Sequence, residues 1–139
     1  MMNNKPEILI VDDEPFYTEV LDNLLREEYR ISIAENGVKA LQRATHEPAP
    51  DLILLDIMMQ DMDGYEVCRQ LKQHPVSKDI PIIFLTARRD VDDEVLGFNL
   101  GAVDYITKPI SPPIVRARVR THIEMMQLRK QLEKLGHCS

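Results

Sequence analysis

The sequence predicts an α/β protein in which a doubly wound, five-stranded parallel sheet carries helices on both faces. Five short runs rich in Ile, Leu and Val recur along the 139 residues, and stretches with helical spacing lie between them. Apolar runs that no polar residue interrupts are typical of strands buried on both faces. Because strand and helix alternate five times, the strands are expected to run parallel, with helices covering each side.

The five strands are predicted from apolar runs that end at polar or turn-forming residues. In chain order these runs are Ile8–Val11, Ile31–Ala34, Leu52–Leu55, Ile82–Leu85 and Val103–Ile106. All five are short, which suits strands of a small sheet better than buried helices.

The helices are predicted from apolar residues spaced three or four apart. The markers of the first four are Phe16, Val20 and Leu24, with Leu21 and Leu25 beside them; Val38, Leu41 and Ala44; Val67, Cys68 and Leu71; and Val95, Leu96 and Leu100. The fifth helix follows Ser111, because prolines at 112 and 113 fit a first turn, where the missing N–H costs nothing. No helix breaker follows before Leu135.

Composition and charge exclude several functional classes. Hydrophobic residues make up 44% of the chain and charged residues 29%, as in an ordinary globular domain. No apolar run approaches the ~20 residues that a membrane span needs, and the N-terminus has no apolar signal-peptide core. A cytoplasmic protein without membrane contact is therefore expected.

The charge is unevenly distributed along the chain. Residues 1–115 carry 11 Lys and Arg against 21 Asp and Glu, a balance of −10, whereas residues 116–139 carry 6 against 2, a balance of +4. An acidic body argues against nucleic-acid binding, which depends on neutralising phosphates. The basic tail is interpreted as the solvated face of a helix.

Polar side chains gather where the predicted strands end. Asp12 and Asp13 follow the first run, Asp56 follows the third, Thr86 the fourth, and Lys108 closely follows the fifth. In parallel sheets the carboxyl ends of the strands share one edge, where ligands bind. Three carboxylates, one hydroxyl and one ammonium are therefore predicted to meet there.

These residue types suit phosphoryl transfer. Clustered carboxylates repel one another unless a cation intervenes, and Mg²⁺, or Mn²⁺ in its place, is bound by carboxylates, water and phosphate oxygens. A carboxylate can also be a nucleophile that forms an aspartyl phosphate. Asp56 is the candidate because it stands alone after the central run, whereas the pair Asp12 and Asp13 suits a metal.

Four segments resemble the response-regulator receiver domain of bacterial two-component signalling. They are ILIVDDEP, DLILLDIMMQDMDGYEVC, IIFLTA and GAVDYITKP, and the similarity covers roughly residues 6–123. Each segment alone is a weak signal, but together they stand in the family's order at the predicted strand ends. The resemblance implies a flavodoxin-like fold with strand order 2-1-3-4-5 and a receiver domain over residues 1–123.

The resemblance also implies the central roles. The residue matching Asp56 accepts a phosphoryl group from a sensor histidine kinase, and the domain acts as a regulatory switch rather than an enzyme. Asp12 and Asp13 are implied to bind Mg²⁺ together with the Asp56 carboxylate and the backbone carbonyl of Met58.

Further roles follow from the same resemblance. Thr86 and Lys108 are implied to contact the phosphoryl group, Tyr105 to change rotamer with Thr86, and the Lys108–Pro109 bond to be cis. The chain departs from the family at Gln60, where Pro is frequent, so a less restricted loop is expected there.

The C-terminal stretch, residues 124–139, is predicted to extend the last helix beyond the receiver. Met125, Leu128, Leu132 and Leu135 follow a 3-4-3 spacing, which favours the start of a coiled coil. We expect a homodimer through this helix and the face formed by the fourth helix, fifth strand and fifth helix. The stretch resembles a connector to an output domain that makes or degrades a cyclic dinucleotide, or to a histidine-kinase module. The alternative is an amphipathic helix packed on its own domain.

Two other functions are weighed against the switch. A phosphatase with an Asp nucleophile would want a second acid two positions after Asp56, where Met58 stands. A phosphorylation-independent interaction module would be expected to lack Asp56, Lys108 or the acidic pair, and all of them are present.

Overall fold

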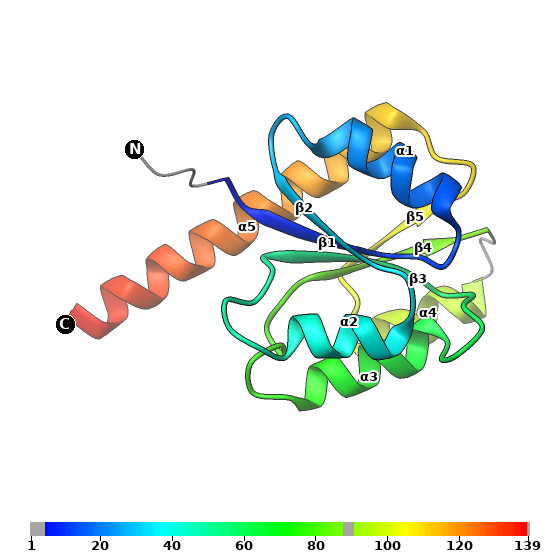
Figure 1. Cartoon of the computed structure of the whole chain (residues 1–139). Coiled ribbons are helices and arrows are strands. Elements are labelled where there is room, and N and C mark those ends of the chain that lie inside the picture. The colour runs from blue at the N-terminus through cyan, green and yellow to red at the C-terminus, as the bar shows by residue number, and fades with distance from the viewer. Residues whose placement is uncertain (1–4, 88–90, 139) are drawn as a thin grey trace.

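The fold is a single parallel sheet, seen in a computed structural model that describes residues 5–87 and 91–138 (Figure 1). The strands are β1 (Glu7–Val11), β2 (Arg30–Ala34), β3 (Leu52–Asp56), β4 (Ile82–Thr86) and β5 (Asp104–Thr107). Their order is β2-β1-β3-β4-β5, and every neighbouring pair is parallel. The predicted fold class and strand order are confirmed.

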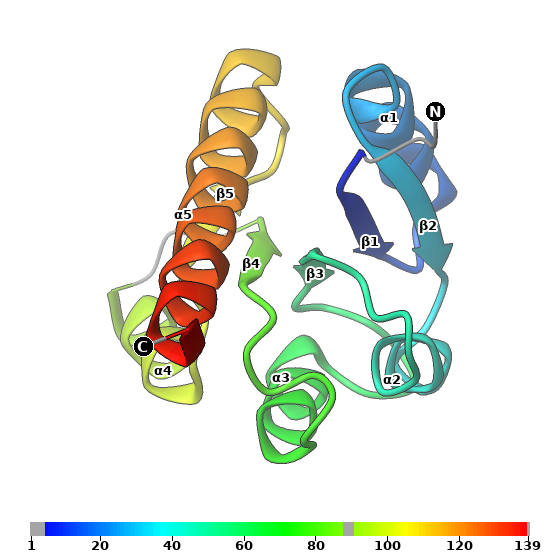
Figure 2. The same cartoon turned by 90° about the vertical axis from the view of Figure 1, so that its left-hand side faces the viewer.

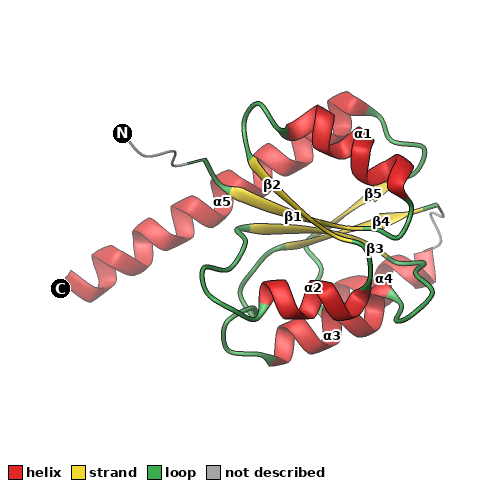
Figure 3. Cartoon of the chain, in the orientation of Figure 1, coloured by secondary structure: helices red, strands yellow, loops and turns green. Residues whose placement is uncertain are grey.

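Helices cover both faces of the sheet (Figure 3). They are α1 (Pro15–Leu25), α2 (Gly37–Ala44), α3 (Gly64–Gln73), α4 (Val91–Leu100) and α5 (Pro112–Cys138). Helices α1 and α5 lie on one side, and α2, α3 and α4 lie on the other (Figure 2). This division gives two apolar cores with the sheet between them.

Alternation along the strands explains why the apolar runs are unbroken. In β1, Leu9 belongs to the core beneath α2 and α3, whereas Ile8 and Ile10 belong to the core beneath α1 and α5. All five residues of β1 are buried, as are those of β3 and β4. Successive side chains of a strand point to opposite faces of the sheet. A strand whose two faces are both covered by helices therefore needs apolar residues at odd and at even positions.

The inward faces of some helices differ from the prediction. In α1 the buried residues are Thr18, Leu21 and Leu25, whereas Phe16 is 68% exposed. Thr18 tolerates burial because its hydroxyl donates to the carbonyl oxygen of Pro15 at 3.0 Å. Leu21 and Leu25 of the predicted apolar set therefore face the sheet, whereas Phe16 lies outside the buried face. Val38 of α2 is likewise exposed.

The last helix, α5, runs unbroken for 27 residues. Val115, Val119, Ile123 and Met126 bury one side of it against the sheet. Its C-terminal part then continues past the amino ends of the strands, away from the body of the domain (Figure 1). Among the described residues, no helix is both long and apolar enough to cross a membrane.

Candidate functional site

The carboxyl ends of the strands bring together an acidic cluster. One carboxylate oxygen from each of Asp12, Asp13, Glu14 and Asp56 lies within 4.8 Å of the others. Asp56 is the last residue of β3 and is 2% exposed, and Asp12, directly after β1, is equally buried. Since β1 and β3 are neighbours in the sheet, strand pairing itself sets these carboxylates side by side. The convergence predicted from the strand ends is present.

A buried ammonium group sits against this cluster. The Nζ atom of Lys108 lies 3.0 Å from Oδ2 of Asp12, 3.4 Å from Oδ1 of Asp56 and 3.2 Å from Oε1 of Glu14. Nζ also lies 4.2 Å from the centre of the Tyr17 ring, a cation–π contact. The lysine side chain is 8% exposed. One cation thus faces several anions in a low-dielectric setting.

Backbone hydrogen bonding fixes the position of Lys108 at the end of β5. Its N–H donates to the carbonyl oxygen of Thr86 at 2.7 Å, which continues the β4–β5 pairing by one residue. The following peptide bond, Lys108–Pro109, is cis, the isomer that the family resemblance implied.

The electrostatics of the cluster leave Asp56 poorly stabilised as an anion. Burial, followed by the negative charge of Asp12, raises the pKa of Asp56 to about 7, although Lys108 and the backbone N–H of Met58 act in the opposite direction. Burial alone would lower the pKa of Lys108, but its hydrogen bond to Asp12 and the charges of Asp56 and Asp12 outweigh burial and raise it. A single ammonium does not neutralise the site.

The donor set fits a hard divalent cation. Among the described residues, Oδ2 of Asp56 is buried and takes part in no hydrogen bond, whereas the buried Oδ2 of Asp12 faces the Lys108 ammonium at 3.0 Å. A buried carboxylate oxygen without a hydrogen-bond donor is costly, and a cation that prefers oxygen ligands would satisfy it. The additional positive charge would also lower the pKa of Asp56.

The loop after β3 is tied to the cluster through its backbone. The N–H of Met58 donates to Oδ1 of Asp56 at 3.3 Å, and the N–H of Gln60 donates to Oδ2 of Asp13 at 3.2 Å. The side chain of Met58 is exposed, so only the backbone of this residue faces the predicted site. The loop after β3, where a less restricted backbone is expected at Gln60, is therefore held to Asp13 by a hydrogen bond.

The two predicted switch residues lie on the neighbouring strands β4 and β5. Thr86 ends β4 and is buried. Tyr105 lies in β5, is 5% exposed, and pairs in register with Phe84 of β4. Its ring packs against the rings of Phe84 and Phe98, at centroid distances of 5.7 and 5.2 Å. Tyr105 is thus held in a buried orientation.

Two residues at the site were missed by sequence reasoning. Glu14 and Tyr17 were not assigned roles, yet both contact Lys108. Glu14 directly follows the acidic pair, which is a signal that could have been used. Tyr17 offers no such signal, because its contact depends on the direction in which α1 leaves β1.

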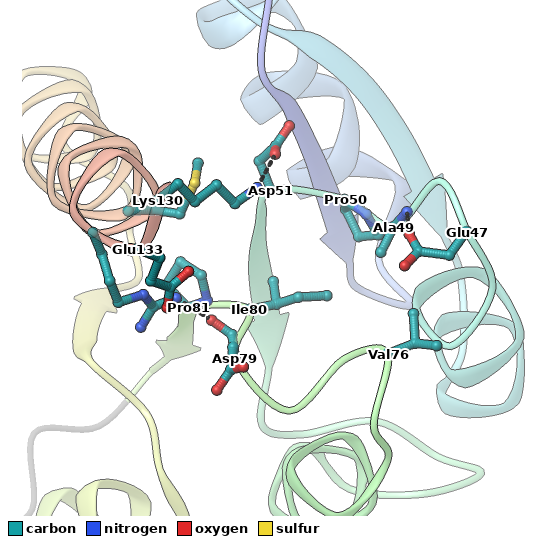
Figure 4. A pocket seen from close by; sticks show the side chains of 12 residues that line it. Glu47, Ala49, Pro50, Asp51, Val76, Asp79, Ile80, Pro81, Lys130 and Glu133 are labelled. Atoms are coloured by element: carbon teal, nitrogen blue, oxygen red, sulfur yellow. Dashed lines mark hydrogen bonds and ion pairs between the residues drawn. The ribbon is translucent and has the colours of Figure 1, made fainter. Parts of the chain in front are cut away.

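A separate cavity of about 220 Å³ lies at the opposite end of the strands (Figure 4). It separates α5 from the loops that precede β3 and β4, and none of the predicted site residues lines it. At its edges, Arg129 donates to the carbonyl oxygen of Asp79 at 2.8 Å, and Lys130 lies 3.6 Å from Asp51. These contacts join the extended part of α5 to the base of the domain.

The fold and the acidic edge together define a phospho-accepting module. Residues 8–120 match the model of the response regulator receiver domain. The chain therefore belongs to the response regulator receiver domain family of two-component signalling. As a receiver domain, it is a regulatory switch that accepts a phosphoryl group.

Curated relatives share this domain as part of longer proteins. The chain is 48% identical over 117 residues to a probable cyclic di-GMP phosphodiesterase of Vibrio cholerae, covering 84% of the chain and 26% of the relative. It is 45% identical over 128 residues to the alkaline phosphatase synthesis transcriptional regulatory protein PhoP of Bacillus subtilis, covering 91% and 51%. The chain thus spans between about a quarter and half of these relatives.

Solved receiver domains are similar in structure. The signal receiver domain of a signal transduction histidine kinase from Syntrophus aciditrophicus matches with a TM-score of 0.77 and 38% identity, over 86% of this chain and 90% of that one. The receiver domain of a sensor histidine kinase from Pseudomonas aeruginosa, which has a magnesium ion coordinated in its active-site cleft, matches with a TM-score of 0.79 and 29% identity, over 86% and 98%.

Proposed function

We propose that Asp56 is the phosphoacceptor and that a sensor histidine kinase is the donor. The observation that carries this proposal is the placing of Asp56, whose Oδ1 faces the Lys108 ammonium at 3.4 Å while Oδ2 is buried among carboxylates without a hydrogen bond. In the transfer, an Asp56 oxygen forms a bond to phosphorus. The bond between phosphorus and the donor imidazole nitrogen breaks, and its electron pair stays on that nitrogen.

The surrounding residues take complementary roles in this proposal. Lys108 neutralises negative charge on the transferred group, and it is preorganised because Asp12, Glu14 and Tyr17 already hold its Nζ in place. The Thr86 hydroxyl, at the end of the strand beside β3, donates to a phosphoryl oxygen. In this arrangement the site needs little reorganisation before transfer.

A magnesium ion, or a manganese ion, completes the site. Asp12, Asp13, the Asp56 carboxylate and the Met58 carbonyl would hold it. When bound, it offsets the negative charge that gathers on the phosphoryl oxygens during transfer. The buried Asp56 oxygen that lacks a hydrogen bond supports this assignment.

Acetyl phosphate, a small phosphoryl donor, tests the proposal without a partner kinase. Wild-type protein incubated with acetyl phosphate and Mg²⁺ should take up a lasting phosphoryl group, whereas Asp56→Asn and EDTA should each abolish the uptake. Asp79→Asn is the matched control, since this exposed aspartate lies at the other end of the sheet.

The competing functions predict other results in the same experiment. Rapid hydrolysis of many phosphoesters would favour a phosphatase. No uptake by wild-type protein would favour a phosphorylation-independent module.

We further propose that residues 1–123 form the receiver and that residues 124–139 connect it to an output. Arg118 offers a route for the signal, because its guanidinium donates to the carbonyl oxygen of Tyr105 and contacts Asp104 at 3.1 Å. His122, one turn further along α5, contacts the same carboxylate at 3.0 Å. A movement of Tyr105 would therefore be transmitted to α5 through these contacts. The output we favour is a domain that makes or degrades a cyclic dinucleotide, or a kinase module.

The extension also supports a proposed parallel homodimer. Its apolar stripe, defined as Met125, Leu128, Leu132 and Leu135, is exposed along its length. The contacts of Arg129 and Lys130 with the base of the domain use a different side of the helix, so the stripe stays available while the helix is docked. A coiled-coil seam of fewer than two heptads holds two chains only weakly by itself. The face formed by α4, β5 and α5 is the natural second contact.

A further inference from the structure

Tyr105 occupies a slot that has no room for a side chain on the facing helix. The floor of this slot is Gly97 of α4, which is buried. A Cβ atom added at Gly97 would lie 1.9 Å from the hydroxyl oxygen and 2.8 Å from Cζ of Tyr105. It would also lie 2.9 Å from Cε2 of Phe84. All three distances are shorter than van der Waals contact, so even alanine would displace the tyrosine ring.

The ring has little freedom to yield sideways. Phe98 packs edge-on against it at 5.2 Å between centroids, and Phe84 is tilted against it at 5.7 Å. Phe98 follows Gly97 in α4, and Phe84 lies in β4, the strand that pairs with Tyr105. An added methyl group would therefore push Tyr105 out of the slot rather than along it.

Backbone conformation does not account for glycine at this position. Among the described glycines, only Gly101 has a positive φ. Gly97 sits within a helix, where glycine is less favourable than alanine. The space that its missing side chain leaves for Tyr105 is what this glycine provides.

We propose that Gly97 is the positioning residue that permits the buried orientation of Tyr105 and so sets the balance of the switch. The steric half of this proposal, that Gly97 leaves room for the Tyr105 ring, rests on the distances from a Cβ atom added at Gly97. The regulatory half rests on the proposed function and on the coupled change of Thr86 and Tyr105 that the family resemblance implies, in which a phosphoryl group on Asp56 draws Thr86 inward and makes room for Tyr105. A ligand on Asp56 then favours the state in which Tyr105 lies against Gly97, and a side chain at 97 opposes that ligand.

Tyrosine ring resonances test the steric half. With ring-labelled tyrosine, Tyr105→Phe identifies the Tyr105 signal, and a soluble paramagnetic chelate reports ring exposure. Gly97→Ala should raise the relaxation of the Tyr105 ring severalfold. Gly136→Ala is the matched control, because it adds the same methyl group to a helical glycine with nothing within 4 Å of the new Cβ. A Tyr105 ring equally protected in Gly97→Ala and wild type would overturn the proposal.

Binding of beryllofluoride with Mg²⁺ tests the regulatory half. Gly97→Ala should weaken the affinity about tenfold relative to wild type, as expected when the binding-competent state becomes a minor population. In a Tyr105→Leu background the same substitution should have little effect, since the clashing ring end is gone. An equal loss in both backgrounds would trace the effect to Phe84 and contradict the proposal.

Folding and function are separable in this design. If Gly97→Ala fails to fold, the Tyr105→Leu double variant should regain cooperative unfolding, and failure of both would overturn the proposal. If wild-type protein binds no beryllofluoride, the proposed function fails, while the ring measurement still decides the role of Gly97.

Discussion

The ammonium nitrogen of Lys108 lies 3.4 Å from an oxygen of Asp56 and 3.0 Å from an oxygen of Asp12, so one buried cation is shared by two buried carboxylates. A shared cation leaves the site with excess negative charge. Burial, followed by that excess charge from Asp12, raises the pKa of Asp56 to about 7 in spite of its lysine neighbour. The site is thereby prepared for a further cation and for a phosphoryl group held between positive charges.

The raised pKa of Asp56 predicts a pH-dependent stability of the metal-free protein. The folded pKa of about 7 exceeds the ordinary value of 3.8, so the folded state binds the proton more tightly than the unfolded state. This contribution is complete below about pH 4 and is lost as pH rises through about 7. In EDTA, the melting temperature should therefore fall between about pH 5 and 8. Asp56→Asn, which cannot ionise, should flatten that fall, and an unchanged slope in the variant would refute the assignment.

Removal of the lysine charge should impair transfer more than folding. Lys108→Met keeps the side-chain length but removes the ammonium charge that lies 3.4 Å from Asp56. We expect labelling by acetyl phosphate to slow by about a hundredfold or more, the size typical of losing one charge-stabilising donor. Radiolabel uptake over time measures this. Lys78→Met, an exposed lysine at the other end of the sheet, serves as the control, and equal rates for both variants would count against Lys108.

The backbone N–H of Gln60 should contribute to metal binding by orienting Asp13. This N–H holds Oδ2 of Asp13 at 3.2 Å, and proline has no N–H to replace it. Gln60→Pro should weaken Mg²⁺ binding severalfold, whereas Gln60→Ala keeps the donor and should bind like wild type. Titration calorimetry distinguishes them. Equal affinity of all three proteins would show that the hydrogen bond does not matter for the metal.

The proposed dimer should depend on the apolar stripe of α5. Leu128→Asp combined with Leu132→Asp places two charges in the seam, so self-association should be lost both with and without beryllofluoride. Gln127→Asp combined with Gln131→Asp adds the same charge at the same spacing outside the stripe and should leave it intact. Sedimentation at several concentrations measures the effect. A wild type that is monomeric in both states would rule out the coiled-coil relay.

The sequence was most informative where burial is complete. Strands covered on both faces must be apolar throughout, so the central strand β3 was predicted to within one residue of its observed end at Asp56. The cluster of Asp12, Asp56 and Lys108 was predictable because the ends of parallel strands share one edge. Element ends and their order were sufficient for that inference.

Contacts between elements were less predictable than the elements themselves. Phe16 has a spacing that suits a buried helix face, yet it is exposed because α1 turns Thr18 toward the sheet instead. The contact of Tyr17 with Lys108 and the slot at Gly97 depend on helix placement to within an ångström or two. Local spacing carries no information at that precision.

Chemical localisation of the phosphoryl group tests the central claim most directly. Protein labelled with acetyl phosphate and Mg²⁺ is reduced with borohydride, which converts an aspartyl phosphate to homoserine, and the peptides are sequenced by mass spectrometry. The account predicts homoserine at Asp56 alone, and none when Mg²⁺ is replaced by EDTA. Homoserine at Asp12 or Asp13 instead, or at no aspartate of a protein that has taken up phosphate, would contradict it.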